Sequence, residues 1–312
     1  MVKLQRYLWP KTLLLFFVQE ESIEAAFGYI EKNGVSIEAR RTFKGKKREH
    51  ELMDWYEEIL QAYPKTYLAT MLDSANQGAI PNCSKHDMKR FDIEGSLVHT
   101  LCIEGSWLVY VSLVEMKWFE KKHKSLTFDL IFSPFVMLYE KVKPKLTKTP
   151  ILVVLHQSGV LYVTVFSNEG LWFSQVLTIS DSSIDEEILE SEEDDDIGLA
   201  FDLESLDTDI EPVSEVDTSD NLDSNEESGL ELLEYDLSFS DRLKSAIENF
   251  YHNDLYRHEF LETIFIYDID EKIGKDIVRY IEDELYMNCS LQVLDPIEIM
   301  GELAFSDLGS LK

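Results

Sequence analysis

Two stretches of the sequence share one pattern of apolar and polar positions. In the later stretch, residues 151–155 are apolar throughout, as in a strand that is covered on both faces. Residues 160–166 and 171–179 each follow a polar turn and mix apolar with polar positions, as in strands with one face nearer to solvent. The pattern therefore predicts a three-stranded meander.

The earlier stretch repeats this order near the N-terminus. Residues 13–18 are apolar, and strands are predicted at 23–30 and 35–43. Asn33 and Gly34 form the dipeptide that is typical of a tight hairpin turn. Two matching units about 138 residues apart indicate two similar halves within one fold. The alternative is that two unrelated meanders occur in an ordinary α/β protein.

Helices and further strands are predicted after each meander. The first meander is followed by a helix at 49–62, a strand at 67–72, a polar loop at 73–92, strands at 97–103 and 107–113, a helix at 115–124, a strand at 127–132 and a helix at 134–142. The second is followed by a helix at 241–253, a strand at 263–267, a helix at 272–286 and a strand at 291–294. Ser133 and Ser240 are the expected N-caps of two of these helices.

Negative charge is concentrated in one segment. Residues 181–236 hold 24 acidic residues and no Lys or Arg, and this composition is typical of a disordered segment. The rest of the chain has 29 basic and 36 acidic residues, so the total of -31 overstates the charge of the folded part. Without a basic surplus, no nucleic-acid partner is expected.

These patterns suggest a division into two halves. The N-terminal half would comprise residues 1–149 and include an inserted α/β subdomain at 67–142. The C-terminal half would comprise residues 150–312. Its helices and strands return to the sheet begun by the second meander, so the acidic disordered insert at 181–236 would interrupt this half.

Cysteine spacing and hydropathy limit the setting of the protein. The three cysteines, Cys83, Cys102 and Cys289, are far apart, and we expect reduced thiols in a cytoplasmic protein. Cys83 and His86 are the nearest approach to a metal-binding pair, but no second pair follows, so a solvated loop is favoured and no metal site is expected. No apolar run approaches the roughly twenty residues of a membrane span. The basic turn at 44–48 is typical of a charged surface, and the alternative is a weak contact with anionic lipid or an acidic partner.

The order of elements resembles that of the actin-like ATPase superfamily. It is most similar to the PilM family of type IV pilus and competence machines, and to the cytoplasmic domain of the type II secretion protein GspL. The resemblance depends on the two meanders, the Trp-x-Val-Tyr-Val strand at 107–111, the strand-to-helix join at 130–135, the helix at 243–254 and the Val-Leu-Asp-Pro ending at 293–296. It implies an α/β, duplicated actin-like (ribonuclease H-like) fold.

The sequence departs from the superfamily at the turns that bind nucleotide. In nucleotide-binding members an acidic residue and glycines at the first turn of each half hold Mg²⁺ and approach the phosphates. Here the first turn has adjacent carboxylates and no glycine, the second has one glycine and no carboxylate, and the third is acidic. The corresponding residues are Glu20, Glu21, Ser22, Gln157, Ser158, Gly159, Asp268 and Asp270.

These departures predict that the chain does not bind ATP tightly and does not hydrolyse it. The carboxylates would repel a polyphosphate, and neither a P-loop nor a GxGxxG motif occurs elsewhere. His156 has no identified nucleophile or orienting carboxylate, so it is interpreted as a turn or core histidine. No catalytic residue and no cofactor are expected.

Family resemblance therefore favours a non-catalytic scaffold at the cytoplasmic face of the inner membrane. It would bind the cytoplasmic tail of a single-span PilN-like or GspM-like protein, with a secretion ATPase as a further partner, and reach the membrane through these partners. One alternative is an ATPase of the same machinery that holds ATP and Mg²⁺ through Glu20, Glu21 and Gln157. Another is an adaptor whose acidic insert captures basic proteins, with an affinity that falls as salt rises.

Overall fold

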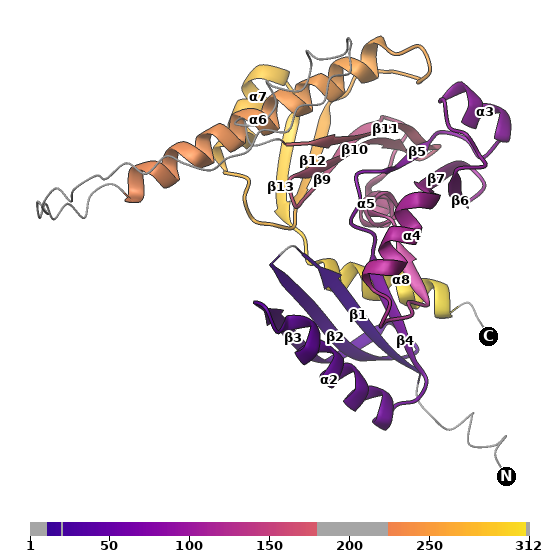
Figure 1. Ribbon diagram of the computed structural model, residues 1–312. Helices are drawn as coiled ribbons and strands as arrows, with labels where there is room; N and C mark the ends of the chain where they lie inside the picture. Colours follow the sequence, from indigo (N-terminus) through magenta and orange to yellow (C-terminus); the bar gives the residue numbers. More distant parts are fainter. Residues whose placement is uncertain (1–10, 20, 180–223, 310–312) are drawn as a thin grey trace, which may run out of the picture.

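The computed structural model describes residues 11–19, 21–179 and 224–309 (Figure 1). The expected disorder of residues 181–223 and the expected role of Glu20 lie outside these residues. The first meander is β1 (Thr12–Val18), β2 (Ser22–Ile30) and β3 (Val35–Lys44), and the second is β9 (Ile151–Gln157), β10 (Val160–Ser167) and β11 (Gly170–Thr178). Both match the predicted strands to within one or two residues.

Two five-stranded sheets have the same topology. Their strand orders are β3-β2-β1-β4-β8 and β11-β10-β9-β12-β13. In each sheet the first strand of the meander also pairs in parallel with a later strand, β1 with β4 (Thr66–Met71) and β9 with β12 (Thr263–Asp268). The parallel edge strands are β8 (Leu130–Phe132) and β13 (Asn288–Val293). The repeated topology confirms the duplicated α/β fold.

Helices cover the outer faces of these sheets. In the first half α2 (Arg48–Ala62) buries Leu52, Trp55 and Ile59 in a cluster with the meander. In the second half α6 (Ser224–His252) and α7 (Asp276–Leu285) cover the sheet through Leu243, Ile277 and other apolar residues. Among the described helices, none combines the length and apolarity that crossing a bilayer requires.

A small third sheet lies between β4 and β8 in the sequence. Its order is β5 (Gln77–Ile80), β7 (Trp107–Ser112) and β6 (Val98–Ile103), and α4 (Leu113–Lys122) follows it. The prediction of a polar loop at 73–92 is wrong, because this segment forms β5 and α3 (Lys85–Arg90). At Gly78 a Cβ would lie 2.5 Å from Tyr110 Oη, so glycine allows β5 to pair closely with β7.

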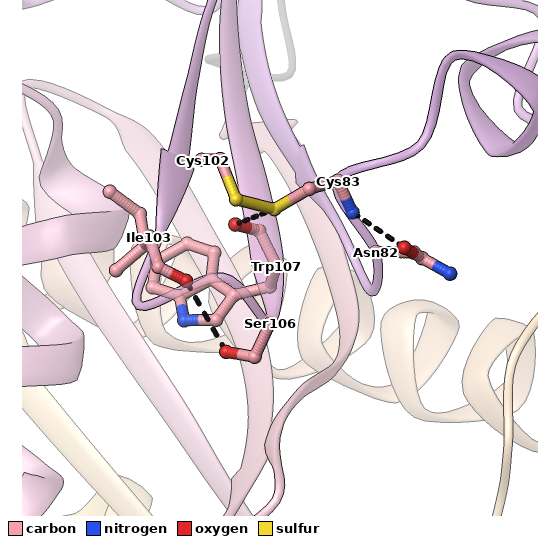
Figure 2. The surroundings of a disulfide bond; sticks show 6 residues. All are labelled: Asn82, Cys83, Cys102, Ile103, Ser106 and Trp107. Atoms are coloured by element: carbon pink, nitrogen blue, oxygen red, sulfur yellow. Dashed lines mark hydrogen bonds between the residues drawn. A yellow bond between two sulfur atoms is a disulfide. The ribbon is translucent and has the colours of Figure 1, made fainter.

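Cys83 and Cys102 form a disulfide, so the expectation of reduced thiols is wrong for this pair (Figure 2). The segment after β5 and the edge strand β6 place the two Cα atoms 5.5 Å apart, although the residues are separated by 19 positions. Such a pairing cannot be inferred from spacing alone. Cys289 keeps a free thiol, and burial raises its pKa to about 12, so it is a poor nucleophile.

Helix α6 begins much earlier than the sequence predicts. We expected a helix from Asp241 with Ser240 as its N-cap, but α6 starts at Ser224. Ser240 lies inside the helix, where its hydroxyl donates to the backbone carbonyl of Asp236 at 2.7 Å. Residues 224–236, which the sequence assigns to the acidic insert, therefore belong to this helix. Packing of Phe239 and Leu243 against the second sheet supports a helix that the local composition disfavours.

Two helices lie between the sheets, each packed on the sheet of the other half (Figure 1). Helix α5 (Pro134–Val142) contacts β9 and β10, whereas α8 (Pro296–Gly309) contacts β1, β2 and β4. A single apolar cluster includes Leu15, Phe135, Leu155 and Met300 from both halves. Pro134 is the first residue of α5 and Ser133 occupies the N-cap position, as predicted, but the Ser133 hydroxyl donates to Gln77 Oε1 and makes no capping hydrogen bond. A 3₁₀ turn (Lys143–Lys145) follows α5.

Candidate functional site

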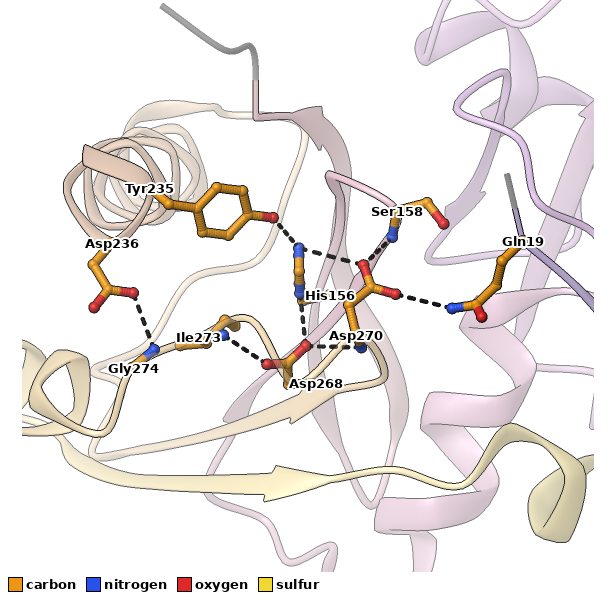
Figure 3. Close-up of polar contacts among 9 residues, drawn as sticks. All are labelled: Gln19, His156, Ser158, Tyr235, Asp236, Asp268, Asp270, Ile273 and Gly274. Atoms are coloured by element: carbon orange, nitrogen blue, oxygen red, sulfur yellow. Dashed lines mark hydrogen bonds and ion pairs between the residues drawn. The ribbon is translucent and has the colours of Figure 1, made fainter. Parts of the chain in front are cut away.

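Three turns from both halves of the chain meet at the carboxylate of Asp270 (Figure 3). Its Oδ1 accepts a hydrogen bond from Gln19 Nε2 at 3.3 Å, and its Oδ2 accepts one from the backbone N–H of Ser158 at 2.5 Å. Gln19 follows β1, Ser158 follows β9, and Asp270 follows β12. The Asp270 carboxylate therefore connects the three turns at which the sequence departs from the nucleotide-binding pattern.

The backbone of the second turn exposes the N–H group that Asp270 binds. Ser158 and Gly159 join β9 to β10 as a two-residue loop, and both have positive φ, 49° and 71°. This is the geometry of a tight type I′ hairpin, which glycine adopts without strain and serine does not. The bond from Ser158 N–H to a carboxylate helps to hold the strained residue in place.

His156 is fully buried between the acidic end of β12 and α6. Its Nδ1 lies 2.7 Å from Asp268 Oδ1, and its Nε2 bonds to the hydroxyl of Tyr235. Because a carboxylate can only accept, Nδ1 carries the proton of its bond to Asp268. The parallel register of β9 and β12 pairs His156 with Asp268, so the predicted core histidine has a carboxylate partner that the sequence analysis did not identify. Tyr235 was missed because it lies in the segment expected to be disordered.

The Asp268 carboxylate is saturated with hydrogen-bond donors. Besides His156 it accepts from the backbone N–H of Ile273 at 2.8 Å and of Asp270 at 3.1 Å. Burial acts to raise the pKa of Asp268, but these donors outweigh it and lower the pKa below its ordinary value. Next to Tyr235, Asp236 accepts from Gly274 N–H at 3.1 Å, where an added Cβ would lie 2.4 Å from the Asp236 carboxylate. Helix α6 is therefore anchored at two adjacent positions, by Tyr235 to His156 of β9 and by Asp236 to the turn after β12.

The remaining predicted residues are not gathered at this junction. Gln157 is fully buried, and neither polar atom of its amide has a hydrogen-bond partner among the described residues. Glu21 and Ser22 line a separate open hollow of about 660 Å³, together with Lys44, Lys46 and Arg48. Among the described residues, no group of three or more His, Cys, Asp or Glu side chains is arranged to bind a metal ion.

The residues at the three turns do not fit Mg²⁺ and ATP. A phosphate at the second turn would compete with Asp270 for the N–H of Ser158. It would also lie close to the carboxylates of Asp268 and Asp270 at a site with little solvent to screen them. Among the described residues of these turns, the buried amide of Gln157 has polar atoms without a hydrogen-bond partner.

A groove of about 520 Å³ lies between the small sheet and the first large sheet. Residues 99–104 of β6 and its turn line one wall, and residues 129–133 of β8 and its flanks line another. Both strands are sheet edges, so each has backbone groups that no neighbouring strand bonds. Leu101, 61% exposed, and Met116 of α4 add apolar surface, and α5 and α8 complete the lining.

Acidic side chains surround this groove. Glu104, Asp129 and Glu140 are among its lining residues, which include no Lys or Arg. Hydrogen bonds from Lys143 and Tyr139 lower the pKa of Glu104, so its carboxylate is charged at neutral pH. The groove therefore offers an extended, apolar and negatively charged surface.

Comparison with solved structures identifies the fold. The PilM–PilN type IV pilus biogenesis complex matches with a TM-score of 0.55 and 13% identity over 95% of this chain and 96% of that one. A Bacteroides thetaiotaomicron protein of actin-like ATPase fold and unknown function matches with a TM-score of 0.45 and 7% identity over 95% and 96%. The cytoplasmic domain of EpsL, an inner membrane component of the type II secretion system of Vibrio cholerae, matches with a TM-score of 0.33 and 12% identity over 54% and 72%. The chain has an actin-like ATPase fold, as expected.

Two family models match the sequence, one in each half of the chain. A search of curated proteins found no match. A family model described as Domain of unknown function (DUF8569) matches residues 9–139, and a second, described as Domain of unknown function (DUF8341), matches residues 152–309. Because the second match takes in half of the chain, the chain belongs to the family described as Domain of unknown function (DUF8341).

Proposed function

We propose that this chain is a non-catalytic scaffold at the cytoplasmic face of an inner-membrane pilus, competence or type II secretion assembly. It binds the cytoplasmic tail of a single-span PilN-like or GspM-like protein, and a secretion ATPase is a further candidate partner. The fold similarity to PilM in a complex with PilN supports this class of function. The observation that carries the proposal is the groove between the edge strands β6 and β8.

The groove suits an extended peptide with basic residues. An added strand can bond to the unpaired backbone edge of β6, while alternate side chains enter the apolar lining formed by Val136, Leu303 and their neighbours. Cytoplasmic segments next to membrane spans carry an excess of Lys and Arg. Lys143 pairs with both Glu104 and Glu140, but these two carboxylates and Asp129 together leave the groove a net negative charge. The basic residues of the tail complement this charge, so the tail of an inner-membrane protein is the occupant that fits both features.

Replacing Leu101 by aspartate should weaken tail binding at least about tenfold, because it removes an apolar contact and places a carboxylate under the added strand, where it must be desolvated. The measurement is fluorescence anisotropy of a labelled tail peptide from the PilN-like or GspM-like protein of the same organism, titrated with the full chain. Val293→Asp is the matched control, because Val293 is 62% exposed and lies on the edge strand of the other large sheet. Equal binding by the wild type and Leu101→Asp would assign the tail to another surface.

We also propose that the chain works without bound nucleotide, since the Asp270 carboxylate already bonds the backbone N–H of the second turn. Calorimetric titration of the full chain with ATP and Mg²⁺ should give no saturable heat. Folding of the same sample is verified by circular dichroism. Micromolar binding that Glu21→Ala abolishes would instead support the alternative, an ATPase of the same machinery.

A further inference from the structure

Helix α4 exposes an apolar and basic strip to solvent. Val114 is 75% exposed and Trp118 is 63% exposed, and their spacing of four residues places them on the same side of the helix. Lys117 lies three residues after Val114, and Lys121 lies three residues after Trp118, so both lysines flank the same strip. A tryptophan so exposed on a helix contributes little to the fold, since its surface remains in contact with water.

The other side of α4 is already used by the fold. Phe119 is buried, and Met116 lines the groove. Leu97, which is 62% exposed, extends the apolar strip at the start of the helix, where its carbonyl accepts from Leu113 N–H. The outward strip therefore remains an unpartnered face of the helix.

The charge of this strip is opposite to that of the chain as a whole. Residues 113–124 contain four lysines and two acidic residues, whereas the chain has a net charge of -31. Lys117 and Lys121 form no ion pair with another described residue, while Glu115 accepts a hydrogen bond from Asn76. In Figure 1, α4 and the projecting end of α6 lie on opposite sides of the molecule, so the described part of the acid-rich segment is remote from this strip. At physiological salt, charges act over a screening length of about 8 to 10 Å, so the nearby lysines determine the electrostatic potential at the strip.

We propose that this outward strip of α4, formed by Leu97, Val114, Lys117, Trp118 and Lys121, is a contact surface for anionic phospholipid. Tryptophan favours the interfacial region of a bilayer, and lysine side chains reach anionic headgroups from the same depth. The strip lies on a convex helix surface, which suits a flat lipid layer, whereas an extended peptide is better accommodated by the groove behind the helix. The chain would then bind the membrane directly, in addition to binding through a partner.

The test is co-sedimentation of the full chain with lipid vesicles. At low salt the wild type should bind vesicles of phosphatidylglycerol and phosphatidylcholine, and should not bind vesicles of phosphatidylcholine alone. The double variant Lys117→Glu/Lys121→Glu should partition onto anionic vesicles at least about tenfold less than the wild type. Trp118→Ala should also bind more weakly than the wild type, but with a smaller loss than the double variant. High salt should weaken the wild-type binding.

A charge-matched control distinguishes this strip from the basic turn after β3. Lys46→Glu/Lys47→Glu carries the same change of charge at exposed positions, and it should bind vesicles like the wild type. Failure of the wild type to bind anionic vesicles, or equal loss in both double variants, would overturn the proposal. Capture of a polyglutamate peptide without vesicle binding would assign the strip to an acidic protein partner and also overturn it. Leu101→Asp should leave vesicle binding unchanged, so this proposal can fail independently of the groove.

Discussion

Replacing Asp268 by alanine should lower the free energy of unfolding by about 3–5 kcal/mol. The substitution removes the acceptor for His156 and for the backbone N–H groups of Ile273 and Asp270, all at a buried strand end. Unpaired donors at such a site cost far more than the net gain from the original bonds. The measurement is urea denaturation followed by circular dichroism. Asp254→Ala, at an exposed position, should stay within about 0.5 kcal/mol of the wild type.

The pH dependence of this difference has a defined sign. Because the pKa of Asp268 is lowered in the folded chain, its contribution to stability is fully present above the ordinary Asp pKa of about 4 and is lost as pH falls through the folded value. The stability gap between wild type and Asp268→Ala should therefore narrow only below about pH 4. A gap under about 1 kcal/mol at neutral pH would contradict the role of this carboxylate as the acceptor of the turn.

Replacing Trp107 by alanine should cost a similar amount, about 3–5 kcal/mol. Trp107 is fully buried, and its ring packs edge-on against Tyr139 of α5 and Phe166 of β10, with centroids 5.4 and 5.6 Å away. Trp107 therefore connects the small sheet to α5, one of the helices between the two large sheets, and to the second large sheet. Its Nε1 has no hydrogen-bond partner among the described residues, so Trp107→Phe should lose less stability than Trp107→Ala.

Denaturant unfolding can compare the buried Trp107 with the solvent-exposed Trp118. Trp118→Ala removes the same side chain from an exposed position and should change the free energy of unfolding by no more than about 0.5 kcal/mol. Equal losses for Trp107→Ala and Trp118→Ala would show that burial at Trp107 does not determine the effect. The comparison also establishes that Trp118→Ala is folded before its vesicle binding is measured.

Much of the architecture could be predicted where local pattern and tertiary packing agree. The meander strands bury continuous apolar runs such as Leu13 to Phe17, and three of their four turns contain or adjoin a glycine with positive φ: Gly34, Gly159 and Gly170. The sequence does not predict β5 or the early start of α6, because the few buried residues that stabilise them, such as Ile80 and Phe239, lie among polar or acidic neighbours. The local pattern in these segments is therefore mainly polar. Packing against a distant part of the chain decides these elements, and no local window contains that information.

The candidate site shows the same limit. The sequence places Ser158, Asp268 and Asp270 at the turns that bind nucleotide in the superfamily it resembles. The structure brings these three residues together with Gln19 and His156. Which carboxylate would bond which N–H depends on the parallel register of β9 and β12, and this register is not visible in the sequence. The contact with Tyr235 was beyond prediction because it required the early start of α6.

The position of α8 has a consequence for biosynthesis. Strand β1 is translated well before α8, yet Leu15 is covered by Met300 and its neighbours in that helix. A nascent N-terminal half must therefore keep one face of its sheet uncovered until α8 has been translated. During that interval the exposed face is a binding site for chaperones and a source of aggregation, so rapid completion of translation should favour a high yield of native protein.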